Sequence, residues 1–233
     1  SSLAFRRASS SLVWCSRRIT TLPTVSPKLA TVPALPYSRA VLQSRGFCSE
    51  MMANPMSHRI VWMDCEMTGL EVETQTLVEI AVIVTDAQLN IVAEGPDIVI
   101  HQDDETLSKM NDWCKETFAK NGLTQRIRDS TVNMKEAEDK VLEFLKTHVM
   151  KGKSPLAGNT IYMDRLFIRK YMPRIDEFLH YRLIDVSTIK ELSYRWYPSA
   201  VASAPAKAMT HRALDDIRES IDELKHYRKN IFK

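Results

Sequence analysis

A short apolar segment that ends in two acidic residues constrains the fold of this chain more than any other feature. Residues 60–63 are apolar and β-prone, as expected of a buried strand, and Asp64 and Glu66 follow two residues apart. Side chains alternate across a strand, so both carboxylates are predicted to project to the same side, while Cys65 points into whatever packs on the other side. Residues 68–69 (Thr-Gly) are expected to end the strand in a turn.

Two carboxylates on one face at the end of a buried strand are costly, because like charges repel and burial disfavours ionisation. A cation held between them removes both costs, and an all-oxygen set of ligands favours a hard ion such as Mg²⁺ or Mn²⁺. An Asp-x-Glu pair alone is also compatible with a strand that runs out into solvent. The apolar segment before the pair and the acidic residues further along the chain favour the metal site.

The net charge is unevenly distributed along the 233 residues. Residues 1–49 contain seven of the 32 basic residues and no acidic residue, so residues 50–233 hold 25 basic and 29 acidic residues, a net charge of −4. An enzyme that binds long nucleic acid usually has a basic body. If the ligand is a polyanion, this body therefore favours a very short one, recognised at both ends.

The first fifty residues are rich in Ser and Arg, and they contain several prolines that would interrupt any helix. This composition is typical of an organelle transit peptide, mitochondrial or plastid, and not of a secretory signal. The sequence Arg-Gly-Phe-Cys at 45–48 resembles a mitochondrial processing site, and Met51 or Met52 could begin a shorter cytoplasmic form. A disordered basic arm that binds nucleic acid is the alternative. We expect residues 1–50 to lie outside the fold and residues 51–233 to form one domain.

The remaining elements are predicted from hydrophobic periodicity and from turn residues. Residues 77–86 and 91–100 read as two strands that form an antiparallel meander with the first, and Glu79 is either a solvent-facing residue or a partner of the site. Later segments read as helices at 108–120, 133–148, 161–171, 187–196 and from 210 onward, short strands at 156–159 and 182–186, and a loop at 198–209. No apolar run approaches the ~20 residues of a membrane span, and we expect no membrane association. The order predicts an α/β fold with a mixed β-sheet flanked by helices, similar to the ribonuclease H-like fold.

Three further segments place polar groups at the ends of elements. Asp164 lies in the first turn of a predicted helix, where an acidic residue is also a common partner of the helix dipole. Asp215 and Asp216 both lie off the apolar stripe of the last helix, so periodicity does not choose between them, and His211 precedes them. Tyr181 belongs to a His-Tyr-Arg cluster at 180–182, which has donors suited to phosphate but is also compatible with an ordinary polar loop.

Together these segments resemble the DEDDh 3′→5′ exonucleases, and most closely the oligoribonuclease family. The resemblance runs from about residue 59 to 232, and its motifs are WMDCEMTGL, GNTIYMD, YMP, HYRLIDVSTIKEL and THRALDDIRES. It implies that two divalent cations, Mg²⁺ or Mn²⁺, are held by Asp64, Glu66, Asp164 and Asp216. The family interval of five residues from His to Asp selects Asp216 over Asp215, and it makes His211 the general base. Tyr162 and Met163, and the loop at 198–209, depart from the bacterial pattern and leave the approach to His211 open.

The resemblance also implies a substrate, namely oligoribonucleotides of a few residues and dinucleotides above all, cut from the 3′ end to nucleoside 5′-monophosphates. It places Leu70 as a wedge and Trp113 as a stacking surface at the terminal bases, although both could be core residues. Residues that cap the 5′-phosphate in the family align with Thr160, Arg182 and Ser187. Tyr181 is similar to a tyrosine contributed to catalysis across a homodimer interface.

Two other functions are compatible with this fold. A proofreading or tRNA-trimming exonuclease of the same superfamily would act on longer RNA or DNA ends. A non-catalytic RNA-binding adaptor would show the loss of at least one metal-binding acid, and none of the four is lost here.

Overall fold

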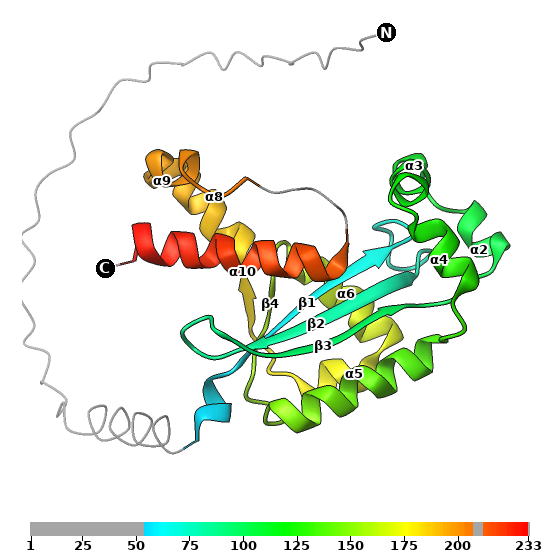
Figure 1. Cartoon of the computed structure of the whole chain (residues 1–233), viewed down its shortest axis with the longest axis horizontal. Helices are drawn as coiled ribbons and strands as arrows, with labels where there is room; N and C mark the ends of the chain where they lie inside the picture. Colours follow the sequence, from blue (N-terminus) through cyan, green and yellow to red (C-terminus); the bar gives the residue numbers. More distant parts are fainter. Residues whose placement is uncertain (1–53, 207–211, 233) are drawn as a thin grey trace, which may run out of the picture.

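The computed structural model describes residues 54–206 and 212–232, so the predicted transit segment and His211 lie outside the described residues. A five-stranded sheet with the order β3-β2-β1-β4-β5 forms the centre of the described chain (Figure 1). Its strands are β1 (Ile60–Met67), β2 (Leu77–Thr85), β3 (Ile91–Val99), β4 (Leu156–Gly158) and β5 (Leu183–Asp185). The first three strands are antiparallel, as predicted, while β4 pairs parallel with β1 and β5 pairs parallel with β4. The predicted mixed sheet is therefore confirmed.

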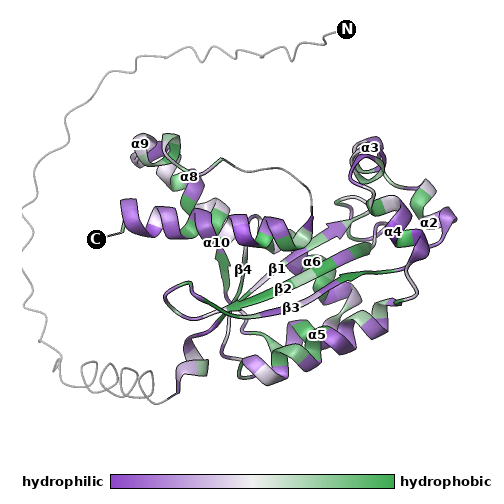
Figure 2. Cartoon of the chain, viewed as in Figure 1, coloured by the Kyte–Doolittle hydropathy of each residue, from purple (hydrophilic) through white to green (hydrophobic). Residues whose placement is uncertain are grey.

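The two faces of the sheet follow from the alternation of side chains along β1. Val61, Met63 and Cys65 pack into one core cluster, which α5 (Met134–His148), α6 (Ile161–Tyr171) and α7 (Pro173–Phe178) complete. Trp62 faces the other way and packs with side chains of α8 (Val186–Trp196) and α10 (Ala213–Asn230). Figure 1 shows α5 and α10 on opposite sides of the sheet, and Figure 2 shows apolar colour concentrated along the central strands. Even-numbered residues of β1 therefore lie beneath α10.

Three short helices pack at the end of the sheet where β1 finishes. They are α2 (Asp104–Ser108), α3 (Asp112–Lys120) and α4 (Leu123–Asp129), and their buried side chains form a cluster with Val78 of β2. The predicted helix at 108–120 is wrong at its start, because Asn111 caps α3 by accepting a hydrogen bond from the Cys114 N–H at 2.8 Å. Gly122, with φ of 78°, follows the end of α3 as predicted.

Prolines account for two helices that the sequence did not predict. Pro173, expected only to end α6, occupies the first turn of α7. Pro198 likewise begins α9 (Pro198–Ala202) inside the segment predicted to be a loop. Proline is well suited to the first turn of a helix, where its missing N–H has no intrahelical partner in any case. A 3-10 helix, η1 (Pro55–His58), precedes β1. Among the described residues, no helix is both long and apolar enough to span a membrane.

Candidate active site

Asp64 and Glu66 lie on the face of β1 that α10 covers, as the strand alternation predicts. Cys65 between them is 7% exposed and packs into the core on the opposite face. The first turn of α10 brings Asp216 to the same place, and carboxylate oxygens of Asp64, Glu66 and Asp216 all lie within 4.8 Å of one another. Asp215, the alternative that periodicity left open, is exposed. Geometry therefore selects Asp216 for the acidic cluster.

Asp164, the fourth predicted acid, reaches the cluster from the open edge of β1. Strand β4 pairs with β1 only at Val61 and Trp62, so the backbone further along β1 is available to other partners. The Cys65 N–H donates a hydrogen bond of 2.9 Å to Asp164 Oδ1, and the aspartate is 6% exposed. Asp164 is thus buried and bonded to the backbone of Cys65, the residue between Asp64 and Glu66. It is not one of the three acids whose carboxylate oxygens lie within 4.8 Å of one another.

The acidic side chains at this site destabilise one another's ionised forms. Burial, and then repulsion by Asp164, Glu66 and Asp216, raises the pKa of Asp64 well above its usual value. Burial and the charges of Asp216 and Glu79 raise the pKa of Glu66 to about 8. Burial likewise raises the pKa of Asp164 to about 7, although the Cys65 N–H favours its ionised form. Without a counter-ion, the fold therefore favours the protonated forms of these carboxyl groups near neutral pH.

These residues fit a divalent cation. Carboxylate oxygens are the ligands that Mg²⁺ and Mn²⁺ prefer, and three of them already lie within 4.8 Å of one another. The raised pKa of Glu66 shows the electrostatic cost of the cluster, which a positive ion would remove. The individual roles of the four acids as ligands stay predictions.

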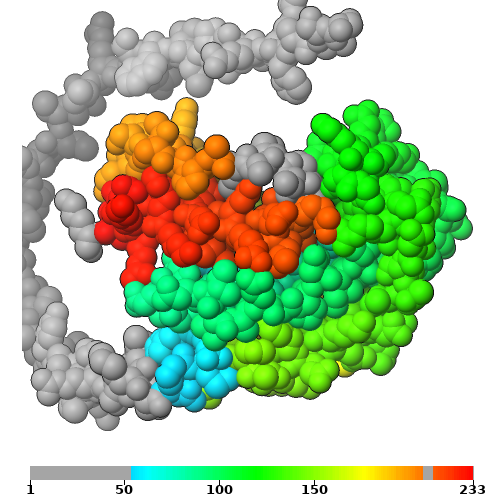
Figure 3. Space-filling view, viewed as in Figure 1, coloured from blue at the N-terminus to red at the C-terminus, as the bar shows by residue number. Residues whose placement is uncertain are grey.

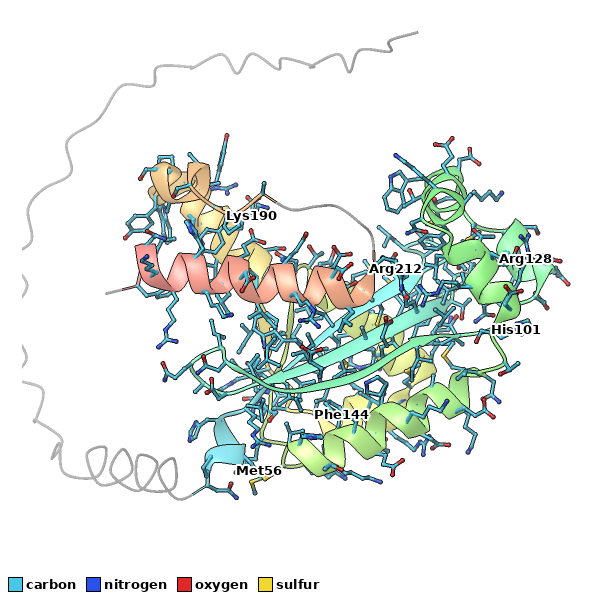
Figure 4. All side chains as sticks on the ribbon, in the orientation of Figure 1. Met56, His101, Arg128, Phe144, Lys190 and Arg212 are labelled. Atoms are coloured by element: carbon cyan, nitrogen blue, oxygen red, sulfur yellow. The ribbon has the colours of Figure 1, made fainter. Side chains whose placement is uncertain are left out.

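Glu79 of β2 is a buried ion-pair partner at the edge of this cluster, which settles the question that the sequence left open. It lies directly opposite Glu66 in the antiparallel pair and is 0% exposed. Its Oε1 lies 3.2 Å from Arg126 of α4 and 3.3 Å from Arg212, the residue before α10. Figure 4 shows Arg212 at the start of α10, above the strands. Burial raises the pKa of Glu79, and the charges of Arg212 and Arg126 oppose this shift. The two arginines also connect β2, α4 and the start of α10 around the acids.

Sequence reasoning assigned no role to Arg126 or Arg212. The signal that could have found them is Glu79 itself, since an acidic residue inside a continuous apolar strand almost always has a partner. Nothing in the sequence says which basic residue supplies the partner, because Arg126 and Arg212 are distant from Glu79 in the chain.

A second group of predicted residues gathers where β4 and β5 end. Thr160 has φ of 54°, a left-handed conformation that is uncommon for a β-branched residue. Its N–H donates to Asp185 Oδ1 and to Ser187 Oγ, both at 3.0 Å, and Asp185 Oδ1 also accepts the Ser187 N–H at 2.9 Å. The loop before β5 presents Tyr181, 73% exposed, with the Arg182 guanidinium 5.5 Å from its ring centre. The predicted phosphate-capping residues Thr160 and Ser187 are therefore neighbours, but their function stays a prediction.

Leu70 and Trp113 are surface residues. Their exposed fractions are 63% and 57%, which excludes the core alternative for both. Leu70 follows the end of β1, and Trp113 lies in the first turn of α3. Their predicted contacts with bases are untested.

A cleft of about 570 Å³ opens beside the acidic cluster. Asp64 and Asp216 line it together with Asn159 and Lys190, and one side is formed by Val201 of α9 and by Ala204 and Pro205 after it. Figure 3 shows α8 and α9 lying against α10. His211, predicted to serve as the base, precedes α10 by two residues but lies outside the described residues.

The chain is similar to known exonucleases over most of its length. The profile of the exonuclease family RNase_T matches residues 61–224. A probable oligoribonuclease of Caenorhabditis elegans is 60% identical over 177 residues, which cover 76% of this chain and 91% of that protein. The chain belongs to the oligoribonuclease family. The human family member, named a mitochondrial oligoribonuclease, is 52% identical over 76% of this chain and 75% of its own length.

Solved structures show the same fold outside the oligoribonuclease family. Exonuclease I of E. coli, in complex with a dA16 oligonucleotide, superposes with a TM-score of 0.60 at 14% identity. The match covers 74% of this chain and only 41% of exonuclease I, so it concerns the fold alone. The predicted ribonuclease H-like fold and the predicted family are thus both confirmed.

Proposed function

We propose that this chain is a 3′→5′ exoribonuclease that hydrolyses very short oligoribonucleotides, dinucleotides in particular, to nucleoside 5′-monophosphates. One observation carries the proposal. In a chain of the oligoribonuclease family, Asp64 and Glu66 of β1 and the distant Asp216 of α10 bring their oxygens within 4.8 Å of one another. A site built only of carboxylates is suited to a hard cation and to phosphodiester hydrolysis.

Asp64, Glu66, Asp164 and Asp216 would hold two divalent cations, Mg²⁺ or Mn²⁺. When bound, such ions stabilise negative charge on the phosphoryl oxygens and on the leaving oxygen. The position of Asp164, fixed by the Cys65 N–H at 2.9 Å, supports this assignment. The ion pair between Arg212 and Glu79 supports it too, because it holds the start of the helix that carries Asp216 against β2.

In this proposal His211 is the general base that accepts a proton from the attacking water. An imidazole suits this task because its unperturbed pKa lies near the working pH. In the sequence it lies five residues before Asp216. Tyr181 takes part from the partner subunit of a homodimer, and its 73% exposure supports a role at a surface between subunits.

Two contacts at the terminal bases and a cap at the 5′ end define the substrate. Leu70 wedges against one base and Trp113 stacks on another, and their exposure leaves both faces accessible. Thr160, Arg182 and Ser187 form the cap around the 5′-phosphate. The net charge of −4 on residues 50–233 supports a short substrate, because such a body has little general attraction for a long polyanion.

We further propose that the enzyme works in mitochondria. The acid-free, Arg-rich residues 1–49 support this location, and the human and mouse relatives are named mitochondrial oligoribonucleases. A plastid location or a shorter cytoplasmic form from Met51 or Met52 are the alternatives.

The second candidate function is that of another DEDDh exonuclease acting on longer RNA or DNA ends. The fold itself does not separate the two functions, because exonuclease I, solved in complex with a dA16 oligonucleotide, has a similar fold. Turnover of a 5′-phosphorylated dinucleotide and of a twenty-residue RNA, measured on the full chain with Mg²⁺ and with Mn²⁺, separates the two. We expect the dinucleotide to be consumed faster, and a clear preference for the longer strand would establish the second function instead.

The Asp64→Asn variant tests the site in the same assay. Hydrolysis should fall by about a thousandfold or more while the circular dichroism spectrum stays unchanged, because one metal-ligating charge is lost from a site that depends on charge. Asp215→Asn is the matched control, since Asp215 is adjacent to Asp216 but exposed. Equal activity of Asp64→Asn and wild type would remove the site assignment.

A further inference from the structure

Asn159, at the exit of β4, connects the acidic cluster to the predicted phosphate cap. Its Nδ2 donates to Ser220 Oγ at 2.8 Å and to Glu223 Oε2 at 3.1 Å, both on α10. Its Oδ1 accepts a hydrogen bond of 3.0 Å from Ser187 Oγ. Ser220 in turn donates to the Asp216 backbone oxygen at 2.8 Å. One amide therefore joins the turn of α10 that follows Asp216 to the cap residue Ser187.

Glu223 fixes the orientation of this amide. Glu223 is 5% exposed, its Oε1 accepts from the Tyr227 hydroxyl at 3.2 Å, and Lys190 Nζ lies 3.4 Å from the same oxygen. Burial and the Glu223 charge raise the pKa of Tyr227 to about 12, so the phenol keeps its proton and donates. A carboxylate only accepts hydrogen bonds, so the NH₂ group of Asn159 must face Glu223 and its carbonyl must face Ser187. Figure 4 shows Lys190 on α8, next to α10.

The orientation of the amide decides which hydroxyl hydrogen is available to a ligand. Ser187 has one hydrogen, and it is committed to Asn159 Oδ1. The contact of 3.2 Å between Thr160 Oγ1 and Ser187 Oγ then requires Thr160 to be the donor. Ser187 Oγ thus accepts from Thr160 twice, through the N–H at 3.0 Å and through the hydroxyl. The three side-chain hydrogen bonds therefore run in one direction: Thr160 donates to Ser187, Ser187 donates to Asn159, and Asn159 donates to Glu223.

We propose that Glu223 and Asn159 are positioning residues for recognition of the 5′-phosphate, and that of the two cap hydroxyl groups they make the exposed one of Thr160, not that of Ser187, the donor to it beside Arg182. The inference rests on the proposed function and deepens it. An arriving phosphate oxygen accepts the Thr160 hydrogen at the cost of one hydrogen bond to Ser187, while Ser187 stays bonded to Asn159 and continues to accept the Thr160 N–H. Because Asn159 also bonds to α10, the cap is held at a fixed distance from Asp216, which limits the length of strand that reaches both.

The test compares two substrates in the full chain, the diadenylate with a 5′-phosphate (pApA) and the one without it (ApA). Asn159→Leu removes the amide, and Glu223→Gln keeps the shape but allows the amide of Asn159 to turn around. We expect each variant to lower the ratio of kcat/KM for pApA over ApA by about tenfold, through KM and not kcat, as one lost hydrogen bond to a charged oxygen does. A general loss of structure affects both substrates alike and leaves the ratio unchanged.

A double-mutant cycle with Thr160→Val shows whether the effect passes through Thr160. If it does, Asn159→Leu lowers the ratio no further in the Thr160→Val background. Asn90→Leu, which removes an exposed turn amide bonded to Asp86, is the control and should leave the ratio unchanged. Glu223→Gln decides the question if Asn159→Leu fails to fold.

The outcomes separate this inference from the proposed function. If the wild type cleaves dinucleotides but both variants keep its ratio, or if the wild type has no preference for pApA, the inference is wrong and the proposed function stands. Multiplicative losses in the double variant also overturn it. If the wild type cleaves neither substrate, the proposed function fails, and equilibrium binding of pApA and ApA in EDTA, compared for wild type and variants, decides the inference by the same ratio.

Discussion

Replacing Glu66 by glutamine should stabilise the metal-free protein while it abolishes activity. In the fold, burial and the neighbouring acids raise the pKa of Glu66 from 4.5 to about 8. A raised pKa means that the folded state binds the proton more tightly than the unfolded state does. The resulting stabilisation is complete below pH 4.5 and is lost as the pH rises towards 8. A glutamine resembles the protonated form and avoids this loss at every pH.

The magnitude follows from the size of the shift. Each unit of pKa shift is worth about 1.4 kcal/mol, and pH 7 lies about 2.5 units above the unperturbed value of 4.5. The unfolding free energy of the wild type at pH 7 is therefore about 3 kcal/mol lower than it would be with Glu66 protonated in both states. Glu66→Gln should therefore exceed the wild type in unfolding free energy by about 3 kcal/mol at pH 7 in EDTA, and by about zero at pH 4.

Urea denaturation of the full chain in EDTA at pH 4, 5.5, 7 and 8.5 measures this difference. Glu143→Gln on the exposed face of α5 is the matched control and should follow the wild type at each pH. Addition of Mg²⁺ or Mn²⁺ at about a thousand times its Kd should reverse the order at pH 7, since an ion that binds only the folded wild type then adds about 4 kcal/mol.

Two results would refute this reasoning. If Glu66→Gln is no more stable than the wild type at pH 8.5 in EDTA, the carboxylates do not repel one another in the fold. If divalent ions stabilise both proteins equally, Glu66 is not part of the ion's binding site. Neither result depends on an activity measurement.

Three further changes test other parts of the structure. Gly158→Ala would place a Cβ 2.9 Å from Ile161 Cδ1 and 3.0 Å from the Met63 carbonyl oxygen. The unfolding free energy should therefore fall by about 1–3 kcal/mol in urea titrations. An unchanged midpoint would show that β4 can move away from β1. Glu79→Ala leaves two arginines, 38% and 31% exposed, without their shared carboxylate and should cost about 1–2 kcal/mol in the same titrations, whereas a loss below about 0.5 kcal/mol would make the pairs energetically irrelevant. Trp113→Ala should raise KM for dinucleotides about tenfold at an unchanged melting temperature, and an unaltered KM would exclude stacking on this exposed indole.

The sequence determined the elements that local pattern controls. The apolar segment at 60–63 predicted β1, and the alternation at Asp64 and Glu66 predicted that both carboxylates lie on one face. Asn133 predicted the start of α5, where it forms a capping box with Glu136. These features depend on residues a few positions apart, so local rules find them. Local rules misplaced the start of α3 and missed the helices that begin at Pro173 and Pro198, because a proline that ends one element can begin the next.

At the acidic cluster, the motif spacing of the family identified a residue that hydrophobic periodicity did not. Periodicity did not choose between Asp215 and Asp216, whereas the family interval and the geometry agree on Asp216. The two side chains point in directions about 100° apart on the same helix. Only the docking of α10 over β1, which Ile217 and Ile221 secure in the core, decides which of them faces Asp64.

Tertiary structure alone decided the partners of the buried polar groups. The sequence leaves Glu79 ambiguous, and it gives no reason to pair it with Arg126 and Arg212 or to join Glu223 to Ser187 through Asn159. These groups are separated by dozens of residues in the chain, and their hydrogen bonds form only once helices pack on the sheet. A buried charge requires some partner, and that requirement can be read from sequence, but which residue meets it depends on how the whole chain is packed.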